Sequence, residues 1–308
     1  MEYILPPLKN VNDSNNNFMG AFVNLMRYKG IELDERKVQL FYAGIRLNLT
    51  YRDEINLSSN FSQGVHNFCA ENNIKFREMN IPSDHMKEAV HDILVTDGPC
   101  IIFLDSGNFK YYKSFVNDNV SHCVTVTGID EGGFHIVDSY ASPAPGSVYQ
   151  GVLPFSAISD QKTKRQVRIA YVEGEAKNSF DDARLNLTLE RQKYVNENIY
   201  MEPGSRLKTS ADYCEYIQSD LSVFKGGMLR KVAYNIMTDT HVPQIRMIIP
   251  LFVREKEKYA KLCRLSNDWL LLSYRFLKDS FSTPFQGQEV LLENYRALVN
   301  REQDIYMR

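Results

Sequence analysis

The sequence predicts an α+β domain followed by an all-α domain. Up to about residue 174, short runs of β-branched and aromatic residues alternate with amphipathic segments, as in a fold that packs helices on an antiparallel sheet. The stretch Glu-Gly-Glu-Ala-Lys-Asn-Ser at 173–179 is polar and is typical of a linker. Beyond it, apolar residues recur mainly at helical spacing. We therefore expect an α+β domain over residues 1–174 and a helical domain over residues 175–308.

The first helix is expected to begin at Phe18 and to end near Lys29. Residues 10–17 are rich in asparagine, which favours turns and a helix N-cap. Gly30 is well placed as the residue that follows the helix in a left-handed conformation. The apolar side chains that recur on one helical face are those of Phe18, Phe22, Leu25 and Met26.

The rest of the first domain alternates between helices and strands. Further helices are expected from Asp34, over 63–73, and after Ser83, which is a candidate N-cap. Residues 100–104, Cys-Ile-Ile-Phe-Leu, are apolar throughout, which is typical of a central strand. The expected strands are 75–79, 100–104, 109–115, 122–127, 134–139 and 166–172.

The second domain is expected to be helical because its apolar residues follow helical periodicity. Ser210 and Asn267 are candidate N-caps in this region. The segments with this periodicity are 181–199, 209–224, 227–237, 243–263, 265–280 and 286–304.

Composition excludes several classes of protein. The chain has 308 residues, a net charge of −2 and 24% charged residues, so it lacks the basic excess that binds nucleic acid or an anionic membrane. The longest apolar run, 247–253, is interrupted by Pro250 and is too short to span a bilayer. The first residues lack the basic and apolar regions of a signal peptide, so we expect a cytoplasmic protein.

The five cysteines are scattered, odd in number and without metal-ligand spacing. They are typical of the reduced, mostly buried thiols of a cytosolic protein. No other cluster has metal spacing and no glycine-rich phosphate loop is present, so we expect no metal and no cofactor bound by the chain itself.

The most informative stretch is 121–140, which predicts a β-hairpin. His122 opens the first strand, a turn with a Gly-Gly pair follows at 128–133, and Asp138 lies near the end of the return strand. These two ends are expected to be opposite each other, so that the carboxylate can orient the imidazole. The alternative is an ordinary hairpin with a histidine at its rim.

The residues of this hairpin, His-Cys-Val-Thr-Val-Thr-Gly-Ile-Asp followed by Ile-Val-Asp-Ser, resemble the His/Asp half of a papain-like site. The resemblance is to the bacteriocin-processing cysteine peptidases and to the N-terminal domain of the butirosin biosynthesis protein H family. In those families the nucleophilic Cys heads a helix that reads roughly Cys-x-x-Ala and ends in Tyr-x-Gly. Residues 18–30 of this chain read Phe-Met-Gly-Ala-Phe-Val-Asn-Leu-Met-Arg-Tyr-Lys-Gly, so Phe18 stands at the position of the Cys. The match covers residues 1–174, and the helical segment 228–281 resembles loosely the region often attached to the butirosin-type domain.

The resemblance implies a papain-like fold and catalytic roles for His122 and Asp138. It also implies an oxyanion-binding side-chain amide upstream of the nucleophile, and Asn12 is the candidate, although a turn or capping role for Asn12 is the alternative. Phe18 would shape the substrate pocket.

The neighbours of Phe18 at the helix start, Asn17 and Met19, are candidate substrate-binding residues as well. A shift of one or two residues in the alignment would put one of them at the position of the nucleophile, and neither is a thiol. Cys123, Ser14 and Cys69 have no motif support as substitutes. A conventional cysteine peptidase is therefore excluded.

Three functions remain open. The resemblance implies substrates that are acyl or peptidyl groups on the phosphopantetheine of a carrier protein, transferred to a small amine in a natural-product pathway; His122 would act as general base without a covalent intermediate. The second is a catalytically inactive pseudoenzyme that binds an acyl chain, a peptide or a partner. The third is a purely structural protein with a helical assembly surface.

Overall fold

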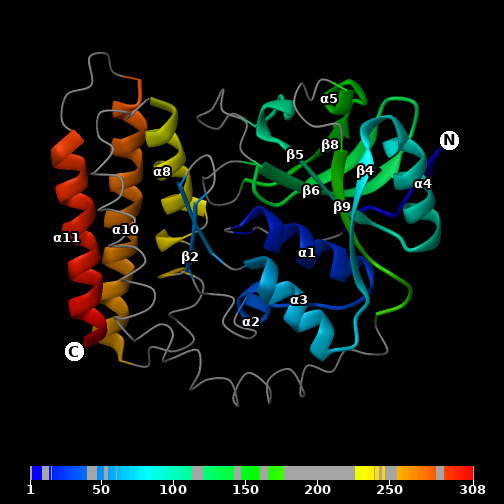
Figure 1. Ribbon diagram of the computed structural model, residues 1–308. Coiled ribbons are helices and arrows are strands. Elements are labelled where there is room, and N and C mark those ends of the chain that lie inside the picture. The colour runs from blue at the N-terminus through cyan, green and yellow to red at the C-terminus, as the bar shows by residue number, and fades with distance from the viewer. Residues whose placement is uncertain are drawn as a thin grey trace. The chain divides into compact units, whose positions relative to one another are not determined.

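The computed structural model describes residues 2–8, 14, 16–39, 47–51, 55–59, 61–112, 121–141, 147–159, 166–176, 226–238, 240–242, 245–246, 255–281 and 288–307 (Figure 1). The chain divides into two compact units: Met1–Phe41 with Val65–Thr188, and Tyr42–Gly64 with Leu189–Arg308. The boundary expected at residue 174 stays a prediction.

The first unit contains an antiparallel sheet with strand order β4-β9-β5-β6-β7-β8, and β1 also pairs with β6. Helices pack on this sheet, so the α+β class expected for the first half of the chain is confirmed. The central apolar run and the two arms of the hairpin are neighbouring strands, as expected. The strands are β1 (Tyr3–Ile4), β4 (Phe76–Pro82), β5 (Cys100–Asp105), β6 (Ser121–Ile129), β7 (Phe134–Asp138), β8 (Tyr149–Leu153) and β9 (Gln166–Val172).

The helices that precede and connect these strands include the one that carries the candidate site. Helix α1 begins one residue earlier than expected because the side chain of Asn16 caps it, accepting hydrogen bonds from the backbone N–H groups of Phe18 and Met19. Gly30 follows its end with φ 76°, as expected for a left-handed residue. The helices are α1 (Asn17–Tyr28), α2 (Glu35–Gln39), α3 (Phe61–Glu71), α4 (Met86–Thr96) and α5 (Ser156–Ser159), with 3₁₀ turns at Ser83–His85 and Ser106–Asn108.

Helices α1 and α4 cover opposite faces of the sheet (Figure 1). The hydroxyl of Thr125 on β6 donates to the carbonyl of Ala21 on α1 at 3.2 Å. Its neighbours Val124 and Val126 point the other way and pack in the core cluster that includes Val90 of α4. Because its side chains alternate, β6 packs against α1 on one face of the sheet and against the α4 cluster on the other.

The pairing of β6 with β7 contains one extra residue. Near the turn Gly128 is level with His135, whereas further along Val126 is level with Ile136, so the register shifts at Thr127. Such a bulge moves every later residue of the partner strand to the other face.

This bulge decides where Asp138 points. In the register set by the turn, Asp138 would be level with Thr125, on the face that α1 covers. With the shift it is level with Val124 instead, on the same face as His122. His122 and Asp138 therefore come together as expected, as diagonal neighbours that the extra residue brings to one face.

The strand expected over 109–115 is not formed at 109–112, and 113–115 lies outside the described residues. A turn replaces it, in which the N–H of Tyr112 donates to the carbonyl of Phe109 at 2.9 Å. The aromatic side chains of this segment pack around His122. Tertiary packing therefore overrides the alternating pattern.

The second unit contains a β-hairpin and three helices among its described elements: β2 (Leu47–Tyr51), β3 (Ile55–Ser59), α8 (Gly226–Thr238), α10 (Lys256–Asp279) and α11 (Gln288–Met307). The expected break before residue 265, with Asn267 as N-cap, is wrong because Asn267 lies within α10. A single buried stripe that includes Leu262, Leu265 and Trp269 keeps this helix continuous. The segments expected over 181–199 and 209–224 lie outside the described residues, so an all-helical second domain stays a prediction.

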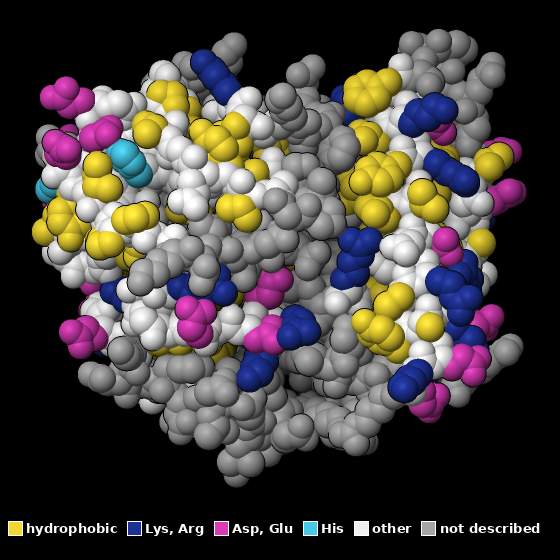
Figure 2. Space-filling model, turned by 180° about the vertical axis from the view of Figure 1, so that it is seen from behind, with side chains coloured by type: hydrophobic (Ala, Val, Ile, Leu, Met, Phe, Trp, Pro, Cys, Tyr) yellow, Lys and Arg dark blue, Asp and Glu magenta, His cyan; other side chains and the backbone are white. Residues whose placement is uncertain are grey.

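The surface carries charges of both signs. On the face that Figure 2 shows, acidic and basic side chains of the described residues are interspersed. Within the part of the chain that the structure describes, no helix is both long enough and apolar enough to span a membrane.

We predict that Gly20→Ala destabilises the first unit. The added Cβ would lie 2.5 Å from the Cβ of Ser139 and 2.6 Å from that of Ser14, so α1 would have to move away from the sheet. We expect a loss of about 1–3 kcal/mol in the free energy of unfolding, measured by urea denaturation. Gly132→Ala is the control: its Cβ would meet only the Asp130 carboxylate, at 3.2 Å, and Val152, at 3.9 Å, and it should change stability by less than about 0.5 kcal/mol. Equal losses in the two variants would contradict this account.

Candidate functional site

The centre of the candidate site is a buried pair of His122 and Asp138. Nε2 of His122 lies 2.7 Å from Oδ2 of Asp138, and both side chains are 0% exposed. Because an ionised carboxylate only accepts hydrogen bonds, Nε2 carries the ring proton. The backbone N–H of Tyr140 donates to Oδ1 at 2.8 Å, and the hydroxyl of Tyr111 donates to Oδ2 at 3.0 Å. The expected orientation of an imidazole by a carboxylate is present.

Aromatic rings enclose the imidazole. Phe109 meets it edge-on, with ring centroids 5.1 Å apart, and Tyr112 lies tilted against it at 4.6 Å. These contacts come from the turn that replaces the expected strand. They fix the ring plane and help to exclude water, which strengthens the hydrogen bond to Asp138.

The second nitrogen of His122 faces the N-terminus of α1. Nδ2 of Asn17, the first residue of that helix, lies 3.1 Å from Nδ1 of His122. With the ring proton on Nε2, Nδ1 is an acceptor and the Asn17 amide donates to it. In a papain-like site this is the place of the nucleophilic thiol.

At the start of α1 the residue that contacts the imidazole is Asn17, so the expectation that Phe18 faces His122 is wrong. The Phe18 ring packs against Phe103 at 5.6 Å and Phe76 at 6.5 Å. Met19 is fully buried. The reason is the helix start: with Asn16 as N-cap, Asn17 takes the first helical position and each following side chain turns by about 100° away from His122. Asn12 lies outside the described residues.

The loop before α1 is held by Ser14. Its backbone N–H donates to the carbonyl of Ser139, and its hydroxyl lies 2.5 Å from a carboxylate oxygen of Glu35. The N–H of Asn16 in turn donates to the Ser14 hydroxyl at 3.1 Å. Ser14 therefore positions the N-cap of α1, and with it Asn17, rather than acting as a nucleophile.

The described cysteines do not replace the missing thiol. Cys123 follows His122 on β6 and is buried on the other face of the strand. Burial raises the pKa of Cys69 and raises that of Cys100 to about 12, so both stay protonated and unreactive. Cys263 is exposed on α10 of the second unit.

The sequence analysis named Asn17 as a candidate through a one-residue shift of the alignment, but it did not predict the contact of Tyr111 with Asp138. No signal existed for Tyr111, because its segment had the pattern of a strand. Among the described residues, no group of three or more His, Cys, Asp or Glu side chains could hold a metal ion.

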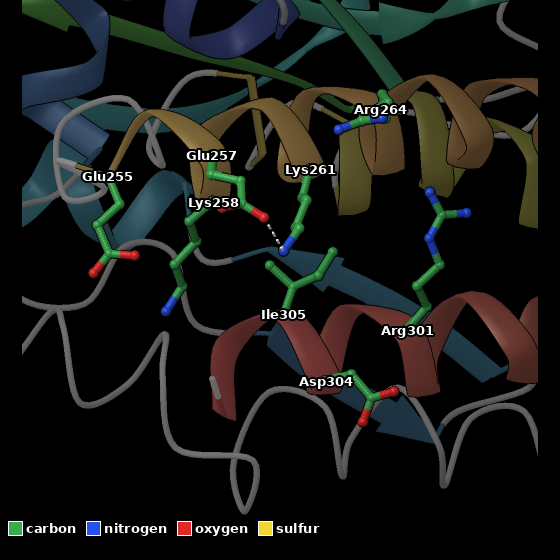
Figure 3. Close-up of a pocket in the computed structure, with 8 residues that line it drawn as sticks. All are labelled: Glu255, Glu257, Lys258, Lys261, Arg264, Arg301, Asp304 and Ile305. Atoms are coloured by element: carbon green, nitrogen blue, oxygen red, sulfur yellow. Dashed lines mark ion pairs between the residues drawn. The ribbon is translucent and has the colours of Figure 1, made fainter.

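A charged cavity in the second unit is a weaker candidate. It has a volume of about 560 Å³ and lies between α10 and α11 (Figure 3). Lys261 pairs with Glu257 at 2.7 Å, and this hydrogen bond lowers the pKa of Glu257. Exposed, mutually compensating charges of this kind are typical of a solvated helix surface. The cavity is lined by Glu255, Glu257, Lys258, Lys261, Arg264, Arg301, Asp304 and Ile305.

No protein-family model matches the chain, and no curated protein matches it. Among solved structures, one described as a C39-like peptidase from Bacillus anthracis matches with a TM-score of 0.34 and 14% identity, over 57% of this chain and 99% of that chain.

We predict that Asp138→Ala strongly destabilises the first unit. It leaves the ring N–H of His122, the hydroxyl of Tyr111 and the N–H of Tyr140 without their acceptor in a buried place. We expect a loss of about 3 kcal/mol or more in the free energy of unfolding, measured by urea denaturation.

The matched control is Asp130→Ala. Asp130 also pairs with a histidine, His135, at 2.6 Å, but both side chains are partly exposed. Water can replace the lost acceptor there, so the loss should be clearly smaller than for Asp138→Ala. A similar loss in both variants would show that burial does not distinguish the two pairs.

Proposed function

We propose that the protein is a papain-like domain that has lost its nucleophile and binds an acyl or peptidyl thioester on a carrier protein without cleaving it. The observation that carries this proposal is the Asn17 amide, which stands 3.1 Å from Nδ1 of His122 where a cysteine peptidase has its thiol. The ligand class comes from the sequence resemblance to the butirosin-type family, and the pathway would be one of natural-product synthesis. A cytoplasmic location, a phosphopantetheine supplied by the carrier and the absence of a bound cofactor belong to the same proposal.

The amide of Asn17 cannot act as the missing nucleophile. Its nitrogen lone pair is delocalised into the carbonyl, and it has no ionisable proton near neutral pH. It also donates to the ring nitrogen that would have to accept a proton in catalysis. The arrangement satisfies His122 in the resting state and leaves no base free for a covalent step.

The same arrangement suits binding. Asn17 is partly exposed, whereas His122 and Asp138 are buried beneath it. A carbonyl oxygen of a ligand can accept from the second N–H of the Asn17 amide while the first stays on His122. The buried pair would thus serve as a rigid support that orients a binding amide.

We predict that Asn17→Cys restores a reactive thiol. A thiol at the start of α1 would face Nδ1 of His122, and both the helix N-terminus and the imidazole stabilise its thiolate. At pH 7 it should react with iodoacetamide about tenfold faster than Cys263, the exposed cysteine of the same chain, as read by peptide mass spectrometry. Incubation with an acyl-N-acetylcysteamine thioester should leave an acyl adduct on the variant and none on the wild type.

Two controls make this test specific. Adding His122→Ala to Asn17→Cys should reduce the alkylation rate to that of Cys263. Phe18→Cys should give no enhanced reactivity, because that side chain packs against Phe103. Fast labelling of Phe18→Cys with slow labelling of Asn17→Cys would show that the helix register at the site is wrong.

A second candidate is amide-forming acyl transfer without a covalent intermediate, and the intact His122–Asp138 hydrogen bond favours it. Asn17 would rotate away, Nδ1 of His122 would take the proton of the attacking amine, and the thiol of the carrier would leave with a proton. A thioester is already activated, so a general base is sufficient in principle.

His122→Ala separates the two candidates. Under our proposal, wild type and His122→Ala both fail to form amide from an acyl-carrier thioester and a primary amine, as followed by mass spectrometry. If the second candidate holds, the wild type turns over and His122→Ala loses about 10²–10⁴-fold in rate, while alkylation of the cysteines has no effect. Turnover in the wild type would therefore overturn the binding proposal.

A further inference from the structure

Tyr111 makes a contact at the site that the sequence did not predict. Its hydroxyl donates to Oδ2 of Asp138 at 3.0 Å. The same oxygen accepts the ring N–H of His122 at 2.7 Å. Two donors therefore share one carboxylate oxygen, and each takes part of its negative charge.

Strand β8 fixes the position of Tyr111 through a stacked aromatic ring. Its ring stacks on that of Tyr149, with centroids 3.6 Å apart and an interplanar angle of 10°. Tyr149 lies on β8, level with Asp138 on β7. The two stacked rings therefore lie directly beside the Asp138 carboxylate, to which Tyr111 donates its hydrogen bond.

Gly151 makes room for this stack. A Cβ at position 151 would lie 2.3 Å from the hydroxyl oxygen of Tyr149 and within 3 Å of two of its ring carbons. The Tyr149 ring therefore lies over the glycine, along its own strand. A side chain at position 151 would displace the Tyr149 ring, and Tyr111 would lose its stacking partner.

The hydroxyl of Tyr111 remains a donor at every physiological pH. Burial raises its pKa well above the usual range, and the charge of Asp138 raises that pKa further. The hydroxyl therefore keeps its proton and stays a hydrogen-bond donor to Asp138.

We propose that Tyr111 is a positioning residue of the site. It shares the Asp138 carboxylate with His122 and so limits the strength of the His122–Asp138 hydrogen bond. The stacked ring of Tyr149 holds Tyr111 in place, and Gly151 leaves the space that the Tyr149 ring needs. The proposal rests on the function proposed above in that it takes the buried pair as the support of Asn17. This effect reaches the other ring nitrogen, Nδ1. A weaker hydrogen bond from the ring N–H to Asp138 leaves the ring less electron-rich, so Nδ1 accepts a weaker hydrogen bond from the Asn17 amide. A ligand can then compete for that amide.

The test uses the full chain with ¹⁵N-labelled histidine and the Nε2–H proton resonance of His122 in NMR spectra. Tyr111→Phe removes only the hydroxyl, so the carboxylate charge concentrates on the remaining donor. The resonance should then move downfield, as it does when a hydrogen bond shortens and strengthens. Tyr171→Phe, which removes a hydroxyl on β9 of the same unit, is the matched control and should leave the resonance in place.

Gly151→Ala provides a second route to the same result and covers the case in which Tyr111→Phe does not fold. It touches neither His122 nor Asp138, yet it should move the resonance in the same direction by displacing Tyr149. An unchanged or upfield-shifted resonance in the folded variant would overturn the proposal, as would an equal shift in Tyr171→Phe. Neither outcome bears on ligand binding, which Asn17→Cys tests separately, so the two proposals can fail independently.

Discussion

The buried hydrogen bond between His122 and Asp138 depends on one extra residue in β6. At Thr127 the pairing of β6 with β7 shifts by one residue. Beyond this point the side chains of β7 share a face with the alternate residues of β6, and Asp138 therefore lies on the same face as His122. Both side chains are 0% exposed, so neither can find water as a substitute partner. A regular hairpin of the same sequence would leave a carboxylate and an imidazole buried on opposite sides of the sheet. The bulge is therefore the constraint on which the site rests.

The second constraint is the close approach of α1 to the sheet. Gly20 has no Cβ, and this absence lets the helix lie against Ser139 at the end of β7 and against the loop at Ser14. Thr125 and the carbonyl of Ala21 add a hydrogen bond between strand and helix. Because the Asn16 cap fixes where the helix begins, this packing places Asn17 opposite the imidazole. Glycine, cap and bulge thus act together to assemble the site from two distant parts of the chain, α1 and the hairpin of β6 and β7.

In the assembled site, an imidazole is oriented by a carboxylate and faces an amide at a helix N-terminus. An imidazole oriented by a carboxylate and facing a helix N-terminus is what a papain-like mechanism uses. The amide of Asn17 changes the chemistry, because it supplies a hydrogen bond where a thiol would supply a lone pair. The carboxylate shared with Tyr111 and the rings of Phe109 and Tyr112 hold the imidazole in place. Among the described residues, no thiol faces this imidazole.

The sequence by itself determined the first helix, the strands β4, β5, β6, β7 and β9 of the sheet, and the approach of His122 to Asp138. These features follow from local periodicity, turn chemistry and the spacing of a short motif. It could not fix the residue that faces the imidazole, because a difference of one position between Asn17 and Phe18 depends on which asparagine caps α1. Nor could it show the bulge at Thr127 or the contact of Tyr111, which are set by packing between segments far apart in the chain. Local preferences fix which elements form, and only tertiary packing fixes the register and the direction of each side chain.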